Sequence, residues 1–217
     1  MTDMTLYLII ALTPLAGCLL AGLFGNTIGR RGAHTVTILG VAVSAVLSAY
    51  VLCGFIDGSR AKFDKNVYTW LTMNGLDFSV GFLVDSLTAL MMVVVTSVSL
   101  MVHIYSFGYM HGERGFQRYY AYLSLFTMSM LGLVLATNIF QMYMFWELVG
   151  VSSYLLIGFY YPLQAAVHAS KKAFIVTRFA DMFFLVGILV FGYFAHSFNF
   201  SFTGTVQLGA HAAPFLN

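Results

Sequence analysis

The chain has 217 residues, of which 60% are hydrophobic and only 8% are charged. A soluble domain carries about 25% charged residues because its surface must be solvated, so this composition excludes a soluble globular protein. The formal net charge of +2, with no long basic cluster, gives no support to a nucleic-acid partner. The apolar residues gather in runs of about 20, enough to cross a hydrocarbon core roughly 30 Å thick. The sequence therefore predicts an integral membrane protein in contact with the lipid bilayer.

Six apolar runs predict an all-α fold of about six transmembrane helices. Pro14 lies inside the first run and should kink it modestly. Pro162 follows the fifth run, where a helix cannot easily continue. We expect one helix bundle over residues 1–196 and an external tail over residues 197–217. The predicted spans are about 6–24, 35–56, 82–104, 120–137, 139–160 and 171–196.

The sequence contains none of the usual motifs for a metal or a cofactor. Cys18 and Cys53 lie inside apolar runs without a CxxC or Cys/His pattern. No glycine-rich phosphate loop or haem motif is present, so we expect no cofactor-binding residues. Residues 15–18 resemble a lipoprotein cleavage box, but no Lys or Arg precedes them, so we expect a retained helix rather than a cleaved signal.

The placement of basic residues predicts that the N-terminus lies outside. Loops on the inner side of a membrane carry an excess of Lys and Arg. With an external N-terminus and six crossings, six basic residues fall inside and three fall outside. The inner set is Arg30, Arg31, Arg114, Arg118, Lys171 and Lys172, and the outer set is Arg60, Lys62 and Lys65.

Three charged residues inside the spans are the main functional candidates: Glu147, Arg178 and Asp181. A charge inside a membrane span costs several kcal/mol unless it faces a polar interior, so each is a functional candidate by default. Glu147 lies roughly 12 Å along the fifth helix and Asp181 roughly 15 Å along the sixth, at 1.5 Å per residue. The two helices cross in opposite directions, so both carboxylates should lie near the midplane. Arg178 and Asp181 are three residues apart and can pair directly.

The charges in these two spans do not balance, because two carboxylates face one guanidinium. Either Glu147 is protonated at rest, or a further cation comes from sequence outside this chain. A carboxylate of this kind can take up and release a proton as its surroundings change. The alternative is a structural role, in which Arg178 and Asp181 only stabilise each other.

Four further residues are weaker candidates: Asp85, His103, Tyr154 and Lys171. Tyr154 shares a helix face with Glu147. Lys171 is also explained as an orientation signal. Asp85 and His103 belong to a polar stripe on the third helix, although its hydroxyls are also explained as packing contacts between helices. The stripe is made of Asp85, Thr88, Thr96, Ser99 and His103.

Several segments resemble a known family. Residues 145–160 (FWELVGVSSYLLIGFY) resemble the fifth-helix signature of the antiporter-like subunits of respiratory complex I. Residues 172–181 (KAFIVTRFAD) resemble the sixth-helix signature of the largest of these, the subunit L or chain 5 family of NADH:quinone oxidoreductase. Residues 85–91 (DSLTALM) and 119–123 (YYAYL) agree with the same family.

This resemblance implies that the chain is the N-terminal part of a longer, proton-translocating membrane-arm subunit. A bacterial inner membrane is the location that it favours. Glu147 would correspond to the glutamate of the proton path, and Arg178 and Asp181 to the charged pair of the sixth helix. The family pairs its glutamate with a lysine on a broken seventh helix, which would supply the missing cation. Its partners would be other membrane subunits, while NADH, flavin, iron–sulfur clusters and quinone would bind elsewhere in the complex.

Two other functions remain open. The large subunit of a multisubunit Na⁺/H⁺ antiporter shares the glutamate and lysine arrangement, and a structural membrane scaffold would need no transport at all. Residues 158–161 (GFYY) and 176–181 (VTRFAD) favour the oxidoreductase over the antiporter. Sequence from the seventh helix onward would discriminate between these two.

Overall fold

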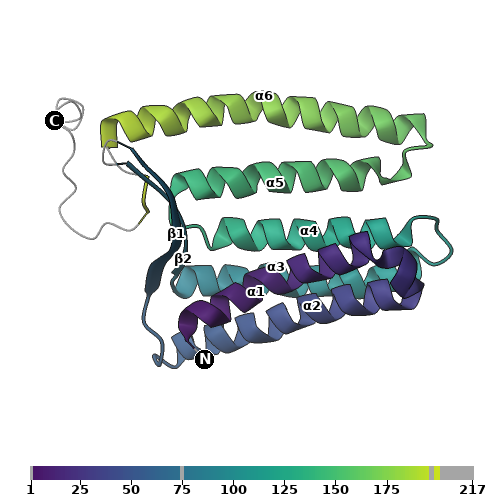
Figure 1. The fold of residues 1–217 in the computed structure, drawn as a ribbon, viewed down its shortest axis with the longest axis horizontal. Coiled ribbons are helices and arrows are strands. Elements are labelled where there is room, and N and C mark those ends of the chain that lie inside the picture. The colour runs from purple at the N-terminus through teal and green to yellow at the C-terminus, as the bar shows by residue number, and fades with distance from the viewer. Residues whose placement is uncertain (1, 74–75, 196–197, 201–217) are drawn as a thin grey trace.

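The computed structural model describes residues 2–73, 76–195 and 198–200, and it is mostly helical, as predicted. Six helices run up and down, and α4, α5 and α6 lie side by side with α6 at the edge (Figure 1). The helices α1, α2 and α3 pack together on the other side of α4. The bounds are α1 Asp3–Leu23, α2 Gly25–Ile56, α3 Ser86–Tyr109, α4 Phe116–Val134, α5 Ile139–Ile157 and α6 Gln164–Ala195.

Five of these helices, all but α4, are long and apolar enough to cross a membrane. The exception has a physical reason, because α4 lies among other helices and does not need an apolar surface all round. Ser124, Thr127 and Ser129 of α4 are all buried. The fold thus keeps the six predicted helices, and α4 buries several polar side chains.

Several helix bounds differ from the predicted spans. The second helix begins ten residues early, at Gly25, and Gly29 interrupts it with φ 73° and ψ −177°. Such a positive φ suits glycine, which has no Cβ. The last helix begins at Gln164 rather than 171, so its first two turns lie before the lysines that were taken to mark its start. The third begins at Ser86 because Asp85 caps it, and its backbone before that point is extended.

A β-hairpin is the feature that the sequence analysis did not predict. The strands β1 (Phe63–Met73) and β2 (Leu76–Val84) pair antiparallel, largely between the second and third predicted spans. The hairpin crosses one end of the bundle, near the N-terminus (Figure 1). We call this end the hairpin end. The opposite end, which we call the basic end, holds the α1–α2, α3–α4 and α5–α6 connections.

Side chains at the α4–α5 junction hold the hairpin to the bundle. The Gln141 amide brackets Gly81, because its Oε1 accepts from the Gly81 N–H at 3.0 Å and its Nε2 donates to the Gly81 carbonyl at 3.0 Å. Asn138 caps α5 by accepting from the Gln141 N–H at 2.7 Å, and its Nδ2 donates to the Ser79 carbonyl at 2.7 Å. Of the expected external tail, only residues 198–200 are described, and Asn199 pairs with Asn138 as an isolated bridge.

Pro14 lies inside α1, where α2 replaces the backbone hydrogen bond that proline removes. Proline lacks an N–H, so the carbonyl of Ile10 loses its helical donor. Ser44 of α2 replaces that donor, with its Oγ 2.7 Å from the Ile10 oxygen. The backbones approach closely here, since a Cβ on Gly40 would lie 2.9 Å from the Thr13 oxygen. Such exchange of backbone partners is how membrane helices tolerate proline.

Candidate functional site

The three main candidates meet between α5 and α6. Arg178 of α6 forms ion pairs with Glu147 of α5 and with Asp181 one turn further along its own helix. Its Nη1 lies 3.4 Å from the Asp181 Oδ2, and its Nη2 donates to the backbone carbonyl of Glu147 at 3.0 Å. Glu147 has no cation near it in the sequence, and the structure brings Arg178 to it across the helix interface.

The charge imbalance nevertheless remains, because two carboxylates share one guanidinium. Asp181 is buried, with 7% of its surface exposed, and each of its oxygens has a donor. Its Oδ1 accepts from the indole Nε1 of Trp146 at 3.2 Å. Sequence reasoning missed Trp146, because its apolar neighbours in the sequence give no sign that its indole meets a charge. An indole is a neutral donor, so it stabilises the Asp181 carboxylate without adding positive charge.

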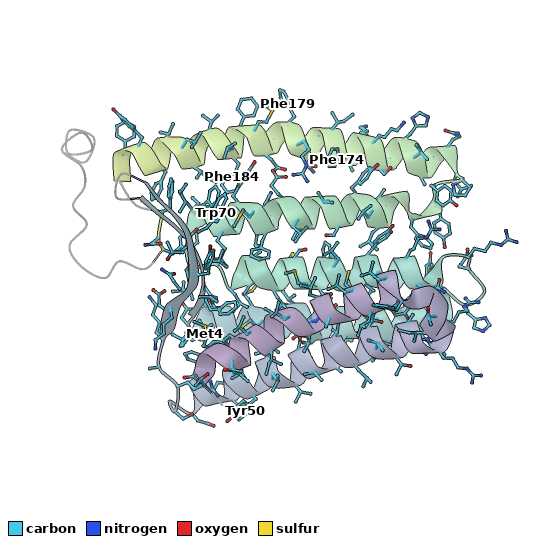
Figure 2. All side chains as sticks on the ribbon, viewed as in Figure 1. Met4, Tyr50, Trp70, Phe174, Phe179 and Phe184 are labelled. Atoms are coloured by element: carbon cyan, nitrogen blue, oxygen red, sulfur yellow. The ribbon has the colours of Figure 1, made fainter. Side chains whose placement is uncertain are left out.

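Small and aromatic residues shape the space around Arg178. A Cβ on Gly150 would lie 3.2 Å from the Arg178 Nη2, so glycine leaves room there for the guanidinium. The ring of Phe174 lies 4.9 Å from the guanidinium carbon, a cation–π contact. The weaker candidate Tyr154 lies behind this ring, with the centroids 5.1 Å apart, and does not contact the charges directly. Figure 2 shows Phe174 on the side of α6 that faces α5.

The site lies at the edge of the bundle. The exposed fractions of the side chains are 26% for Glu147, 23% for Arg178 and 10% for Asp181. Among the described elements, α6 packs mainly on α5 and the short helix η1 (Gly158–Tyr160), and Phe179 and Phe183 on its outer face are exposed. Figure 2 shows Phe179 pointing away from α5. The charges are thus covered on the α5 side and partly open on the other.

One guanidinium between two carboxylates leaves one net negative charge when both acids are ionised. A single proton on either carboxylate would balance this set of charges. The arrangement is therefore chemically suited to taking up one proton.

His103 belongs to a separate polar group between α3 and α4. It is fully buried, with its Nδ1 2.8 Å from the Ser99 carbonyl and its Nε2 3.2 Å from the Ser124 hydroxyl. The hydroxyls of Ser99 and Thr127 lie 2.5 Å apart, and the Tyr120 hydroxyl donates to the His103 carbonyl at 2.9 Å. Ser99 and His103 of the predicted stripe thus face α4, where Ser124, Thr127 and Tyr120 are partners that the sequence did not point to.

The other weaker candidates lie away from the ion pairs. Asp85 caps α3, and its Oδ1 accepts from the Thr88 N–H at 2.7 Å. Lys171 is exposed at the basic end, where it lines a cavity together with Tyr154. Within the described part of the chain, no three His, Cys, Asp or Glu residues gather as a metal site would need.

Comparison with known families decides what kind of chain carries this site. Residues 70–120 match the family model described as NADH-ubiquinone oxidoreductase (complex I), chain 5 N-terminus. Residues 136–212, which include all three charges, match the model described as NADH:quinone oxidoreductase/Mrp antiporter, TM. The chain belongs to the antiporter-like subunit family of NADH:quinone oxidoreductase.

Individual relatives agree with this family. The chain is 69% identical over 202 residues to NADH-quinone oxidoreductase subunit L of Neisseria meningitidis serogroup B, covering 92% of this chain and 30% of that protein. It is 42% identical over 201 residues to the chloroplastic NAD(P)H-quinone oxidoreductase subunit 5 of Mesostigma viride, covering 88% of this chain and 30% of that one. This antiporter-like chain therefore spans about a third of the length of these relatives.

A solved structure supports the fold of the antiporter-like chain. A chain of the membrane-bound sulfane sulfur reductase, an archaeal respiratory membrane complex, superimposes with a TM-score of 0.76. The match covers 89% of this chain and 38% of that one at 17% sequence identity. At that identity the likeness establishes the helical arrangement alone.

Proposed function

We propose that this chain is part of a membrane-arm subunit that translocates protons, and that Glu147, Arg178 and Asp181 form one of its proton-transfer sites. The observation that carries the proposal is the single guanidinium of Arg178 shared by two carboxylates from adjacent membrane helices. Buried ionisable groups inside membrane spans mark ion pathways and proton relays. A static scaffold gains nothing from an uneven charge set, because an isolated buried charge is costly.

In the proposed mechanism, Glu147 carries the proton and Arg178 controls its affinity. With Arg178 on Glu147, the carboxylate stays ionised. When Arg178 pairs with Asp181 instead, Glu147 accepts a proton, and the return of Arg178 expels it. Electron transfer would take place elsewhere in the complex, with NADH, flavin, iron–sulfur clusters and quinone bound to other subunits. Neighbouring membrane subunits would then transmit the driving force.

The proposed orientation places the basic end in the cytoplasm and the N-terminus outside. Its support is the gathering of six basic residues at one end, against three at the hairpin end. Cysteine substituted at position 31 should react with an impermeant thiol reagent only from the cytoplasmic side. Reaction from the outside would reverse the orientation.

Replacement of Glu147 with Gln tests the proton-carrying role. The substitution keeps the size and polarity of the side chain and removes its ability to ionise. We expect proton pumping per assembled complex to fall at least tenfold, while Glu147→Asp retains part of it. The matched control is Glu113→Gln, because Glu113 is the other glutamate of the chain and lies exposed between α3 and α4. Pumping by Glu147→Gln at the rate of the control would refute the role.

A second candidate function is Na⁺/H⁺ antiport, and one observation favours it. The model that matches residues 136–212 names the Mrp antiporter together with the oxidoreductase. Sodium flux in vesicles that contain the assembled protein separates the two functions. Proton pumping driven by NADH, unaffected by a sodium gradient, supports the oxidoreductase, whereas sodium-dependent proton exchange without NADH supports the antiporter.

A further inference from the structure

A cavity of about 260 Å³ lies at the basic end, between α4, α5, η1 and α6. It is lined by Arg118 of α4, Lys171 of α6, and the tyrosines at 122, 154 and 161. The proposed proton-transfer site uses neither Arg118 nor Lys171. The cavity therefore needs an explanation of its own.

The two cations in this cavity lack counter-charges. No acidic residue lines the cavity, and neither Arg118 nor Lys171 forms an ion pair with any residue that the structure describes. The Arg118 guanidinium is held in place, 5.5 Å from the ring centre of Tyr161 and against Gly115, where a Cβ would lie 2.7 Å from its Nη2. Gly115 has φ 84°, which also favours glycine. Two cations on different helices, one of them pre-positioned, suit an anion.

A second cavity at the same end shows the contrast. It is also about 260 Å³ and is lined by Arg30 and Arg31 among others. There Arg30 donates to the carbonyls of Met110 at 3.3 Å and Glu113 at 3.4 Å, so its charge stabilises the α3–α4 connection. Arg118 and Lys171 have no such structural task among the described residues.

The surroundings of the first cavity indicate which anion it takes. Tyr161 lines the cavity and is exposed, and Ile157 and Leu163, near it in the α5–α6 connection, are exposed apolar side chains as well. An anion with an apolar body fits both features, since its charge meets the cations while its chains cover these side chains. Basic pockets between membrane helices bind the phosphate groups of acidic lipids. We propose that this cavity binds the phosphate headgroup of an anionic phospholipid through Arg118 and Lys171.

The test uses the assembled complex in nanodiscs of phosphatidylcholine with increasing amounts of a photoactivatable phosphatidylglycerol. The readout is the mole fraction of that lipid at half-maximal crosslinking to residues 114–122 and 161–172. The cavity variant is Arg118→Gln with Lys171→Gln. The control is Arg114→Gln with Lys172→Gln, which removes the same charge from neighbouring positions outside the cavity lining.

Each cation near a membrane surface contributes about 1 kcal/mol to binding an anionic lipid. The cavity variant should therefore need roughly a 30-fold higher lipid fraction, since 1.4 kcal/mol is a factor of ten. The control should need a clearly smaller increase, because its cations lie outside the cavity lining. The single variant Lys171→Gln, which leaves Arg118 on Tyr161, should need roughly a fivefold higher fraction and covers the case in which the double variant fails to assemble.

Equal losses in the cavity and control variants would overturn the proposal, because binding would then follow total charge. Unchanged crosslinking in the cavity variant would overturn it as well. Competition by millimolar inorganic phosphate would show a site for free phosphate and overturn the lipid as its occupant. None of these results depends on proton pumping, so they test the lipid site independently of the proposed function.

Discussion

Replacement of Arg178 with Gln should destabilise the subunit, because the carboxylates of Glu147 and Asp181 would then repel each other. Arg178 reaches both Glu147 and Asp181 and also donates to the Glu147 carbonyl. Without it, two carboxylates face each other between α5 and α6 with only the Trp146 indole as a described donor. The variant therefore loses more than one hydrogen bond.

The size of the effect follows from burial. Removal of one partner from a fully buried ion pair costs about 3–5 kcal/mol. The three side chains are 10–26% exposed, so we take the lower end, about 3 kcal/mol. A second substitution, Glu147→Gln in the Arg178→Gln background, removes the repulsion and should recover roughly half of the loss. The stability of Arg178→Lys should lie between those of the wild type and the double variant. It keeps a positive charge, but one ammonium cannot bridge two carboxylates as the planar guanidinium does.

The assay is the half-life of the assembled complex on native gels after heating, with the amount of subunit in the membrane as a second readout. The expected order of stability is wild type, Arg178→Lys, Arg178→Gln with Glu147→Gln, and Arg178→Gln alone. If Arg178→Gln alone were as stable as the wild type, or if the second substitution made it worse, the ion pairs would not stabilise the α5–α6 interface.

Two smaller predictions concern the scaffold. Ser44→Ala should cost about 1 kcal/mol, as interhelical hydrogen bonds in membranes average about 0.6 and reach about 1.7 kcal/mol, and Pro14→Ala in the same chain should cancel that cost by restoring a helical N–H donor. Thermal melting of Ser44→Ala in the wild-type chain and in the Pro14→Ala chain measures this coupling. The same cost of Ser44→Ala in both chains would contradict it. Gln141→Leu should leave the Gly81 N–H and carbonyl unpaired, at about 1–3 kcal/mol each, and raise hydrogen exchange in β2. Gln164→Leu at the exposed start of α6 is the control. Equal hydrogen exchange of β2 in both variants would show that the Gln141–Gly81 hydrogen bonds do not hold this strand.

The helices were predictable because their signal is local. Apolar runs long enough to cross a membrane must form helices, since no water is present to satisfy the backbone. The ends were less predictable, because a helix can extend beyond its most apolar run into more polar sequence, as α6 does from Gln164 to Lys171. The hairpin was missed for a related reason. Tyr68 and Trp70 lie in polar sequence between two apolar runs, and aromatic residues at such a place suit a membrane interface as well as a strand.

The site was predictable in its members and not in its contacts. The energetic cost of placing a charge inside a membrane span is enough to single out Glu147, Arg178 and Asp181 as candidates. The spacing of three residues predicted the Arg178–Asp181 pair, and the structure contains it. The Glu147–Arg178 pair depends on the relative height of two helices, which packing decides and no local pattern encodes. Trp146 was missed because a tryptophan in an apolar run resembles any other apolar residue.

His103 supplies the last prediction, because its hydrogen bonds distinguish packing from proton transfer. The Ser99 carbonyl can only accept, so the Nδ1 that lies 2.8 Å from it carries a proton, and the Nε2 accepts from the Ser124 hydroxyl in a neutral ring. Neither bond involves a charged group. Most hydroxyls nearby donate to their own helix, as Thr96 does to the Met92 carbonyl at 2.7 Å, which is the pattern of packing.

We therefore expect His103→Gln, which keeps a hydrogen-bonding side chain that does not titrate, to pump protons at near the wild-type rate per assembled complex. His103→Leu should instead lower the yield of the complex, because the Ser124 hydroxyl loses its partner in a buried position, at about 1–3 kcal/mol. The pumping rate and the amount of assembled complex are measured on the same membranes. A His103→Gln complex that assembles normally and pumps as poorly as Glu147→Gln would make His103 a proton carrier, and the path would then run through α3 and α4 as well as through α5 and α6.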